Sequence, residues 1–230
     1  KIMKKDQEPI PVSFVSIHKD PNGDRPTRIP FNELCQAAYD YGATYIVRIN
    51  DDSEFSTTGW ITMATNALSS FNPPNVGVVG PTCHEGALDI MTHDMVHAPT
   101  HYSIFDTYYP PIFDNYYVDD WMTHAYGKER TIQLEDWVIT HHLTRFWTRY
   151  EPTFHQDKLL DQLVAEGTRS VEKFLFKKEI SAMNGDDPNG DRYRQRDELR
   201  ILGTDIIERV DGPMQELHLS FSKKPNTQLI

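Results

Sequence analysis

The chain has 230 residues, of which 38% are hydrophobic and 11% aromatic, and its formal net charge is -11. This composition supports a packed core and excludes an intrinsically disordered chain. The acidic balance argues against non-specific binding to nucleic acid or to an anionic membrane, since both need basic surface. The sequence also contains no run of roughly 18 apolar residues, so we expect no membrane span.

The two cysteines, Cys35 and Cys83, are too few for a disulfide framework and lack zinc-binding spacing. We expect two free, buried thiols. The sequence opens on Lys1 without an initiator Met, which is consistent with a domain excised from a larger protein. The absence of a targeting segment therefore indicates nothing about compartment.

The first half of the chain predicts a strand, a loop, a helix and a second strand. Residues 11–17 alternate apolar and small side chains, as a strand does, and residues 31–41 carry apolar residues at helical spacing between Pro30 and Gly42. Residues 43–49 form a second apolar run. This order is typical of a βαβ crossover with parallel strands, which places whatever follows residue 49 at the carboxyl edge of the sheet.

The remaining segments extend the same pattern. We predict a helix over 59–70, a turn at 73–75 and a strand over 76–80 that Pro81 stops. Further helices are predicted over 121–127, 131–142, 157–166 and 169–178. The predicted fold is α/β, with a mixed but mostly parallel sheet flanked by helices. We treat 1–230 as one domain, with a core over about 11–150 and a helical extension over about 151–230.

Three histidines follow one another at intervals of four residues: His93, His97 and His101. On a helix this spacing would place three imidazoles on one face, where they could bind a metal. Pro99 interrupts the segment, however, and no other residue nearby has metal-ligand spacing. We therefore favour histidines that line a cleft and contact substrate.

Two acidic pairs each follow an apolar run: Asp51-Asp52, with Glu54 two residues later, and Asp119-Asp120. Carboxylates at a strand end suit a hard divalent cation and the phosphates it accompanies. A second carboxylate centre could take a proton from an attacking hydroxyl. The alternative interpretations are an acidic turn for the first pair and a helix N-terminal pair, favourable to the macrodipole, for the second.

Residues 11–150 resemble the GT-A nucleotide-sugar glycosyltransferases. Asn50-Asp51-Asp52 after an apolar strand looks like the DxD-type metal motif of that family. The segment 76–81 looks like the strand that follows the motif and its helix. Val118-Asp119-Asp120-Trp121 looks like the acidic motif of inverting members. The resemblance implies a three-layer, Rossmann-like GT-A fold and transfer of a sugar from a nucleotide-diphosphate donor, typically UDP-linked, to an acceptor hydroxyl of a glycan or other molecule.

The same resemblance implies a role for each matching residue. Asp52 would bind Mn²⁺ or Mg²⁺, and Asp51, next to Asn50, would contact the ribose of the donor or a metal-bound water. Asp120 would be the general base, with Asp119 as its neighbour or an acceptor contact. The first strand of the family, which contacts the nucleotide base, has no counterpart here, so the base stays open.

Several further residues are candidates for the same site. The family often takes another metal ligand from a later histidine, and we take His142 as the candidate beside the alternatives His141 and His155. Arg28 and Arg48 are candidates for contact with donor phosphate, although structural ion pairs would explain them equally well. Trp60 and Trp121 could stack on a sugar ring or pack in the core.

Other functions remain open at this level. A nucleotidyltransferase uses a similar core and metal carboxylates, but its Gly-rich phosphate loop is absent here. A non-catalytic glycan-binding or degenerate transferase domain would keep the fold without the reaction. The repeated segments 20–25 and 187–192 resemble calcium loops, but Arg192 stands where such a loop needs Gly, so we interpret both as turns.

Overall fold

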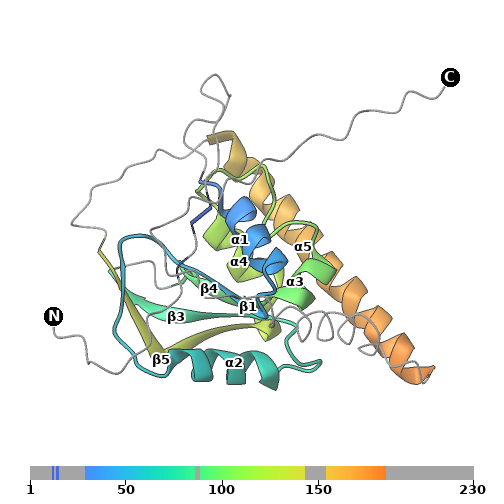
Figure 1. The fold of residues 1–230 in the computed structure, drawn as a ribbon. Coiled ribbons are helices and arrows are strands. Elements are labelled where there is room, and N and C mark those ends of the chain that lie inside the picture. Colours follow the sequence, from blue (N-terminus) through green and yellow to red (C-terminus); the bar gives the residue numbers. More distant parts are fainter. Residues whose placement is uncertain (1–11, 13, 16–28, 86–88, 143–153, 185–230) are drawn as a thin grey trace.

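The computed structural model describes residues 12, 14–15, 29–85, 89–142 and 154–184 (Figure 1). In chain order the elements are α1 (Phe31–Asp40), β1 (Tyr45–Arg48), β2 (Ser53–Phe55), α2 (Trp60–Ser70), β3 (Val78–His84), β4 (Asp94–His97), α3 (Ala98–Ile104), α4 (Val118–Ala125), a 3₁₀ turn (Lys128–Arg130), β5 (Thr131–His141) and α5 (Phe154–Met183). The predicted α/β class is confirmed. None of these helices combines the length and hydropathy that crossing a bilayer requires.

The five described strands form one mixed sheet in the order β1-β4-β3-β5-β2. The pairs β1·β4, β3·β4 and β2·β5 are antiparallel, and β3·β5 is parallel. The prediction of a mostly parallel sheet is therefore wrong for these strands. It failed because β4, which the sequence did not predict, lies antiparallel between β1 and β3. Even so, β1, β3 and β5 run in the same direction, and their carboxyl ends share one edge.

Two other predictions changed. The segment predicted as a helix over 131–142 is strand β5, whose β-branched and aromatic residues Trp137, Val138 and Ile139 fit a sheet between two neighbours. Strand β3 continues through Pro81, because the register shifts between Pro81 and Thr82 and the ladder has an irregularity there.

The N-terminal strand predicted over 11–17 is not observed in its described part. Val12, Phe14 and Val15 have no regular secondary structure, and the other residues of that segment lie outside the described part of the chain. The helices predicted at 31–41 and 59–70 are confirmed as α1 and α2. The crossover that we predicted from the first strand is therefore not shown, although its helix and its second strand are.

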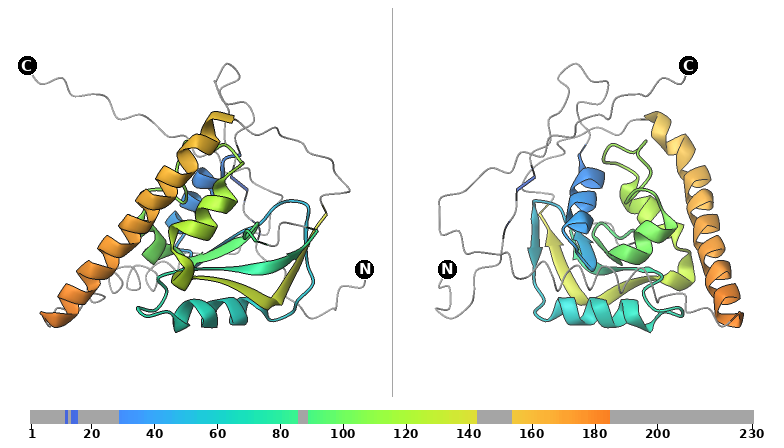
Figure 2. Two further views of the ribbon diagram at one scale, coloured as in Figure 1. Left: turned by 180° about the vertical axis from the view of Figure 1, so that it is seen from behind. Right: turned by 45° about the vertical axis from the view of Figure 1, so that its right-hand side comes forward.

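Helices lie on both faces of the sheet. Helix α2 covers one face, while α1, α3 and α4 lie over the other and α5 runs along their outer side (Figures 1 and 2). Buried residues from α2, β3, β4 and β5 form one apolar cluster, including Leu68, Val79, Met95, Trp137 and Ile139. A larger cluster fills the other face, where Trp121, Met122 and Ala125 of α4 pack beneath α5. Both predicted thiols are buried and free.

A glycine allows the close approach of α5 to α4. The helices predicted at 157–166 and 169–178 are one continuous helix, with Gly167 in its middle. A Cβ atom at Gly167 would lie 2.9 Å from the Cβ of Ala125 and 3.3 Å from Cζ2 of Trp121. The indole Nε1 of Trp121 donates a hydrogen bond to the carbonyl of Leu163, 3.1 Å away. Trp121 therefore packs in the core rather than presenting its ring to a ligand.

Candidate functional site

Both acidic pairs lie at the edge of the sheet where β1, β3 and β5 end. Strands β2 and β4 begin at the same edge, because Ser53 pairs with His141 and Arg48 pairs with Asp94. Ligands bind at the carboxyl ends of strands in open α/β sheets. Residues that are distant in the sequence, from Asn50 to His141, thus meet at one edge.

A carboxylate and an imidazole meet at the centre of this edge. Oδ1 of Asp52 lies 2.9 Å from Nε2 of His141, and Nδ2 of Asn50 lies 3.3 Å from the same nitrogen. The backbone N–H of His142 donates to the carbonyl of Asp52 at 2.9 Å, which ties the end of β5 to the acidic loop. We call Asp52 and His141 the Asp52–His141 pair.

The predicted ligand His142 points elsewhere. Its Nε2 lies 3.2 Å from Oε2 of Glu54, and the Glu54 side chain is 64% exposed. Of the two candidate histidines whose side chains are described, His141 is thus the one whose ring reaches Asp52. A ligand role for His142 stays a prediction. The side chain of His155 and the whole of Arg28 lie outside the described part of the chain.

The 2.9 Å between Oδ1 of Asp52 and Nε2 of His141 is the distance of a hydrogen-bonded pair, and it is also a spacing that two neighbouring ligands of a divalent cation can have. In octahedral coordination at about 2.0–2.1 Å, adjacent ligands are about 3 Å apart, close to the 2.9 Å observed here. A carboxylate with an imidazole suits Mn²⁺ better than Mg²⁺, which prefers oxygen ligands throughout. Among the described residues no group of three or more His, Cys, Asp or Glu side chains has metal-site geometry. Two described side chains alone would leave most of the coordination positions of such an ion to other ligands.

The second acidic pair lies in the first turn of α4, and its two aspartates differ. Oδ1 of Asp119 accepts a hydrogen bond from Nη2 of Arg48 at 2.6 Å. Burial raises the pKa of Asp119 to about 6, although the nearby Arg48 opposes the shift. Asp120 is partly exposed and has no hydrogen-bond or ion-pair partner among the residues that the structure describes. Asp119 is thus held in place by Arg48, whereas the side chain of Asp120 has no such contact among the described residues.

Arg48 connects β1 to both β4 and α4. It is 4% exposed; its Nε donates to Oδ1 of Asp94 at 2.8 Å, and its Nη2 lies 2.6 Å from the same oxygen in an ion pair. The other oxygen of Asp94 accepts a hydrogen bond from the hydroxyl of Tyr108 at 2.6 Å. Burial would lower the pKa of Arg48, but Asp94 and Asp119 together raise it above its ordinary value. The structure shows a guanidinium enclosed by two carboxylates, and contact with donor phosphate stays a prediction.

The three spaced histidines do not share a helix face, because His93 precedes β4, His97 ends it and His101 lies in α3. His101 is fully buried and contacts the hydroxyl of Tyr126 and the carbonyl of Tyr108. Nδ1 of His97 lies 2.8 Å from the hydroxyl of Thr100, on the far edge of the sheet. His93 alone reaches the acidic edge.

His93 is fully buried beside the Asp52–His141 pair. Its Nε2 lies 2.6 Å from the hydroxyl of Ser53, and its Nδ1 lies 2.9 Å from the hydroxyl of Thr92. Its ring stands edge-on to that of His141, with centroids 5.3 Å apart. Burial lowers the pKa of His93 to about 3, helped by Arg48 and His141, so the ring is neutral at pH 7.

Sequence reasoning missed Ser53 and Asp94 as parts of this edge, and it proposed His93 as a cleft-lining histidine without placing it beside the acidic pair. The available signal was the polar run of residues 92–94, directly before an apolar strand segment.

Trp60, predicted to stack on sugar or to pack, stacks between Phe55 and Trp137 at centroid distances of 4.7 and 5.0 Å. Asp51 is exposed beside Asp52, as a residue that contacts a ligand would be.

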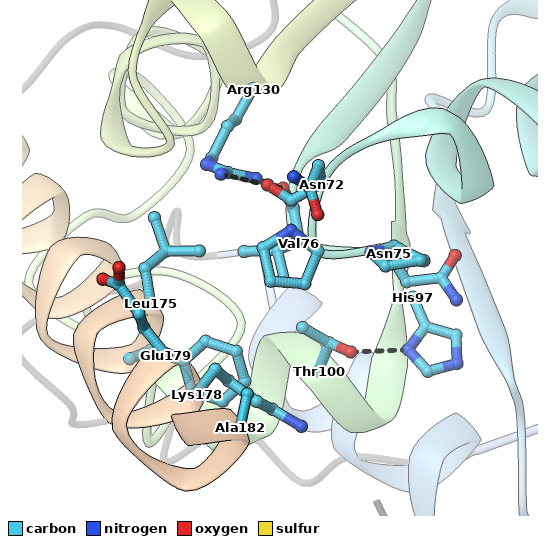
Figure 3. A pocket seen from close by; sticks show the side chains of 13 residues that line it. Asn72, Asn75, Val76, His97, Thr100, Arg130, Leu175, Lys178, Glu179 and Ala182 are labelled. Atoms are coloured by element: carbon cyan, nitrogen blue, oxygen red, sulfur yellow. Dashed lines mark hydrogen bonds between the residues drawn. The ribbon is translucent and has the colours of Figure 1, made fainter. Parts of the chain in front are cut away.

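A separate cavity of about 750 Å³ lies at the opposite edge of the sheet (Figure 3). The turn before β3, the start of α3 and the last turns of α5 form its walls, with Asn75, Val76, Thr100 and Leu175 among the lining residues. In the same wall Arg130 donates to the carbonyls of Asn72 and Val76. Of the histidines predicted to line a cleft, His97 lines this cavity, whereas the described residues predicted for the metal and base sites do not.

Comparison with known proteins adds no relative: no family model, no curated protein and no solved structure matches this chain.

Proposed function

We propose that this protein is a metal-dependent glycosyltransferase that moves a sugar from a nucleotide-diphosphate donor to an acceptor hydroxyl. One observation carries the proposal. The Asp52–His141 pair and the Asp119-Asp120 pair lie at the same sheet edge, although Asp52 and Asp119 are 67 residues apart in sequence. Arg48, at the end of the strand that precedes Asp52, contacts Asp119. A cation-binding centre next to an independent proton acceptor is what such a transfer requires.

The donor would lie over the Asp52–His141 pair. Mn²⁺, or Mg²⁺, would neutralise the charge that develops on the departing diphosphate. Asp52 and His141 would hold the ion, and the exposed carboxylate of Asp51 would contact the ribose or a water molecule. The amide of Asn50, 3.3 Å from Nε2 of His141, helps to keep the imidazole turned toward Asp52. UDP is the nucleotide that the family resemblance favours.

The acceptor would approach from α4. Asp120 would take the proton of the attacking hydroxyl, because its carboxylate is not engaged by another described residue. Direct attack opposite the leaving diphosphate inverts the configuration of the sugar carbon. Asp119, held by Arg48, would keep the first turn of α4 at a constant distance from the metal pair. The finer fold assignment, a three-layer GT-A-like domain, belongs to the same proposal.

Thermal unfolding with nucleotide and metal tests the proposal. We expect UDP with Mn²⁺ to raise the melting temperature, because a ligand at 100 times its Kd stabilises by about 2.7 kcal/mol. EDTA, Asp52→Ala or His141→Ala should abolish the shift. Asp161→Ala, on the exposed face of α5, is the matched control and should keep it. A shift of equal size in EDTA, or no shift with any nucleoside diphosphate or nucleotide sugar, would overturn the metal-dependent donor site.

A further inference from the structure

The ring of His141 lacks the hydrogen bond that usually orients a metal-binding histidine. A ligating imidazole normally donates its second N–H to a carboxylate, a backbone carbonyl or water, and this contact fixes the ring. In this protein Nδ1 of His141 is buried and has no hydrogen-bond partner among the described residues. The 3.3 Å contact of Asn50 is on Nε2, the nitrogen that would face the metal, so a further contact is needed to orient the ring once a metal is bound.

His93 makes the contacts that could do so. Its ring packs against the ring of His141 at 81°, with centroids 5.3 Å apart, and limits the rotation of that ring about its Cβ–Cγ bond. Through the 2.6 Å contact with the hydroxyl of Ser53, His93 also holds the residue that follows Asp52. The buried side chain of His93 thus contacts both Ser53, which follows Asp52, and the imidazole of His141.

The backbone around His93 is itself tightly placed. A Cβ atom on Gly80 of β3 would lie 2.5 Å from the carbonyl oxygen of His93, so only glycine allows the two segments this close. The next residue, Asp94, has no exposed surface and is bound by Arg48 and Tyr108. His93 therefore projects from a segment whose backbone is fixed, and its contacts restrict the movement of His141 and of Ser53, which follows Asp52.

We propose that His93 is a positioning residue that orients His141 and Asp52 for metal binding, in place of a hydrogen bond on Nδ1 of His141. The inference rests on the proposed function, because it takes the Asp52–His141 pair as the metal site. His93 itself touches neither metal nor substrate in this account.

The test measures the Kd of Mn²⁺ by the loss of its free-ion electron paramagnetic resonance signal, with and without UDP. Removal of a residue that supports a metal ligand typically costs 10–100-fold in metal affinity. We expect His93→Ala to weaken Mn²⁺ binding by that factor. The matched control is His101→Ala, since His101 is equally buried and also has two polar contacts, but lies away from the edge. It should lower stability and leave the Kd of Mn²⁺ within about threefold.

Glutamine variants cover the case in which an alanine variant does not fold. His93→Gln can keep a hydrogen bond to Ser53 but loses the ring contact, so it should still weaken Mn²⁺ binding, whereas His101→Gln should not. Unchanged Mn²⁺ affinity in His93→Ala or His93→Gln, or equal losses in the His101 variants, would overturn the positioning role. If the unaltered chain binds no Mn²⁺, with or without UDP, the metal pair and the proposed function fail together. Failure of the positioning role of His93 is therefore distinguishable from failure of the proposed function, because only the second abolishes Mn²⁺ binding by the unaltered chain.

Discussion

At the scale of single residues, the two aspartates that begin α4 are adjacent in sequence but have different surroundings. Arg48 holds Asp119 at 2.6 Å, while Asp120 has no such partner among the described residues. The sequence could place the acidic pair at a helix start, but it could not show which carboxylate was engaged. That distinction depends on Arg48, 71 residues away from Asp119. It supports Asp120 as the base and Asp119 as its neighbour.

Substitution of Asp120 tests this division. Asp120→Asn keeps the shape of the side chain but cannot accept a proton, so we expect donor binding to persist and transfer to fall by about 10²–10⁴-fold. The measurements are the thermal shift with UDP and Mn²⁺ and the rate of product formation. Near-full transfer by Asp120→Asn would show that another group takes the proton, and loss of transfer in Asp119→Asn alone would assign it to Asp119.

Arg48 is the residue whose interpretation changed most. In the sequence it is a candidate for contact with phosphate, but its guanidinium is buried between two carboxylates. Arg48→Met would leave Asp94, whose side chain has no exposed surface, without its cation. Loss of one partner of a buried ion pair typically costs about 3–5 kcal/mol, and we expect that loss in urea unfolding. Arg169→Met, on the exposed face of α5, should change stability by no more than about 0.5 kcal/mol. A cost below about 1 kcal/mol for Arg48→Met would mean that this network does not hold α4 to the sheet.

At the scale of elements, local pattern predicted helices better than strand partners. Apolar residues at helical spacing between Pro30 and Gly42 identified α1. Gly42 has a φ of +90°, the left-handed conformation that commonly ends a helix. Strand β4 has four residues, all buried, so it shows no alternation that a sequence reader could use. Strand direction is a tertiary property, and the sequence predicted neither it nor strand β5, whose residues were predicted to be helical.

The contact of α5 with α4 gives a prediction at this scale. Gly167→Val would push side-chain atoms against Ala125 and Trp121, and overpacking of this kind typically costs about 1–3 kcal/mol. Ala165→Val, two residues earlier on the exposed side of the same helix, is the matched control, and should cost roughly 0.5 kcal/mol or less. Chemical denaturation of both variants measures the difference. Equal costs would contradict close packing of α5 on α4.

At the scale of the whole molecule, the sheet separates two regions. One edge collects the acidic pairs and the histidines that contact them, and the opposite edge holds the cavity of about 750 Å³ (Figure 3). The sequence predicted the acidic edge from two motifs, although the crossover that justified it was only partly shown. Asp52 and His141 meet where β1 and β5 end, because these two strands run in the same direction; a functional site at this edge stays a prediction.

Product analysis tests the central claim most directly. The protein would be incubated with nucleotide sugars, an acceptor glycan and Mn²⁺, and the released nucleotide would be identified. We predict release of a nucleoside diphosphate, with formation of a new glycosidic bond, and loss of both in EDTA and in Asp52→Ala. Production of pyrophosphate from a nucleoside triphosphate and a sugar phosphate, with no nucleoside diphosphate from any nucleotide sugar, would contradict the account.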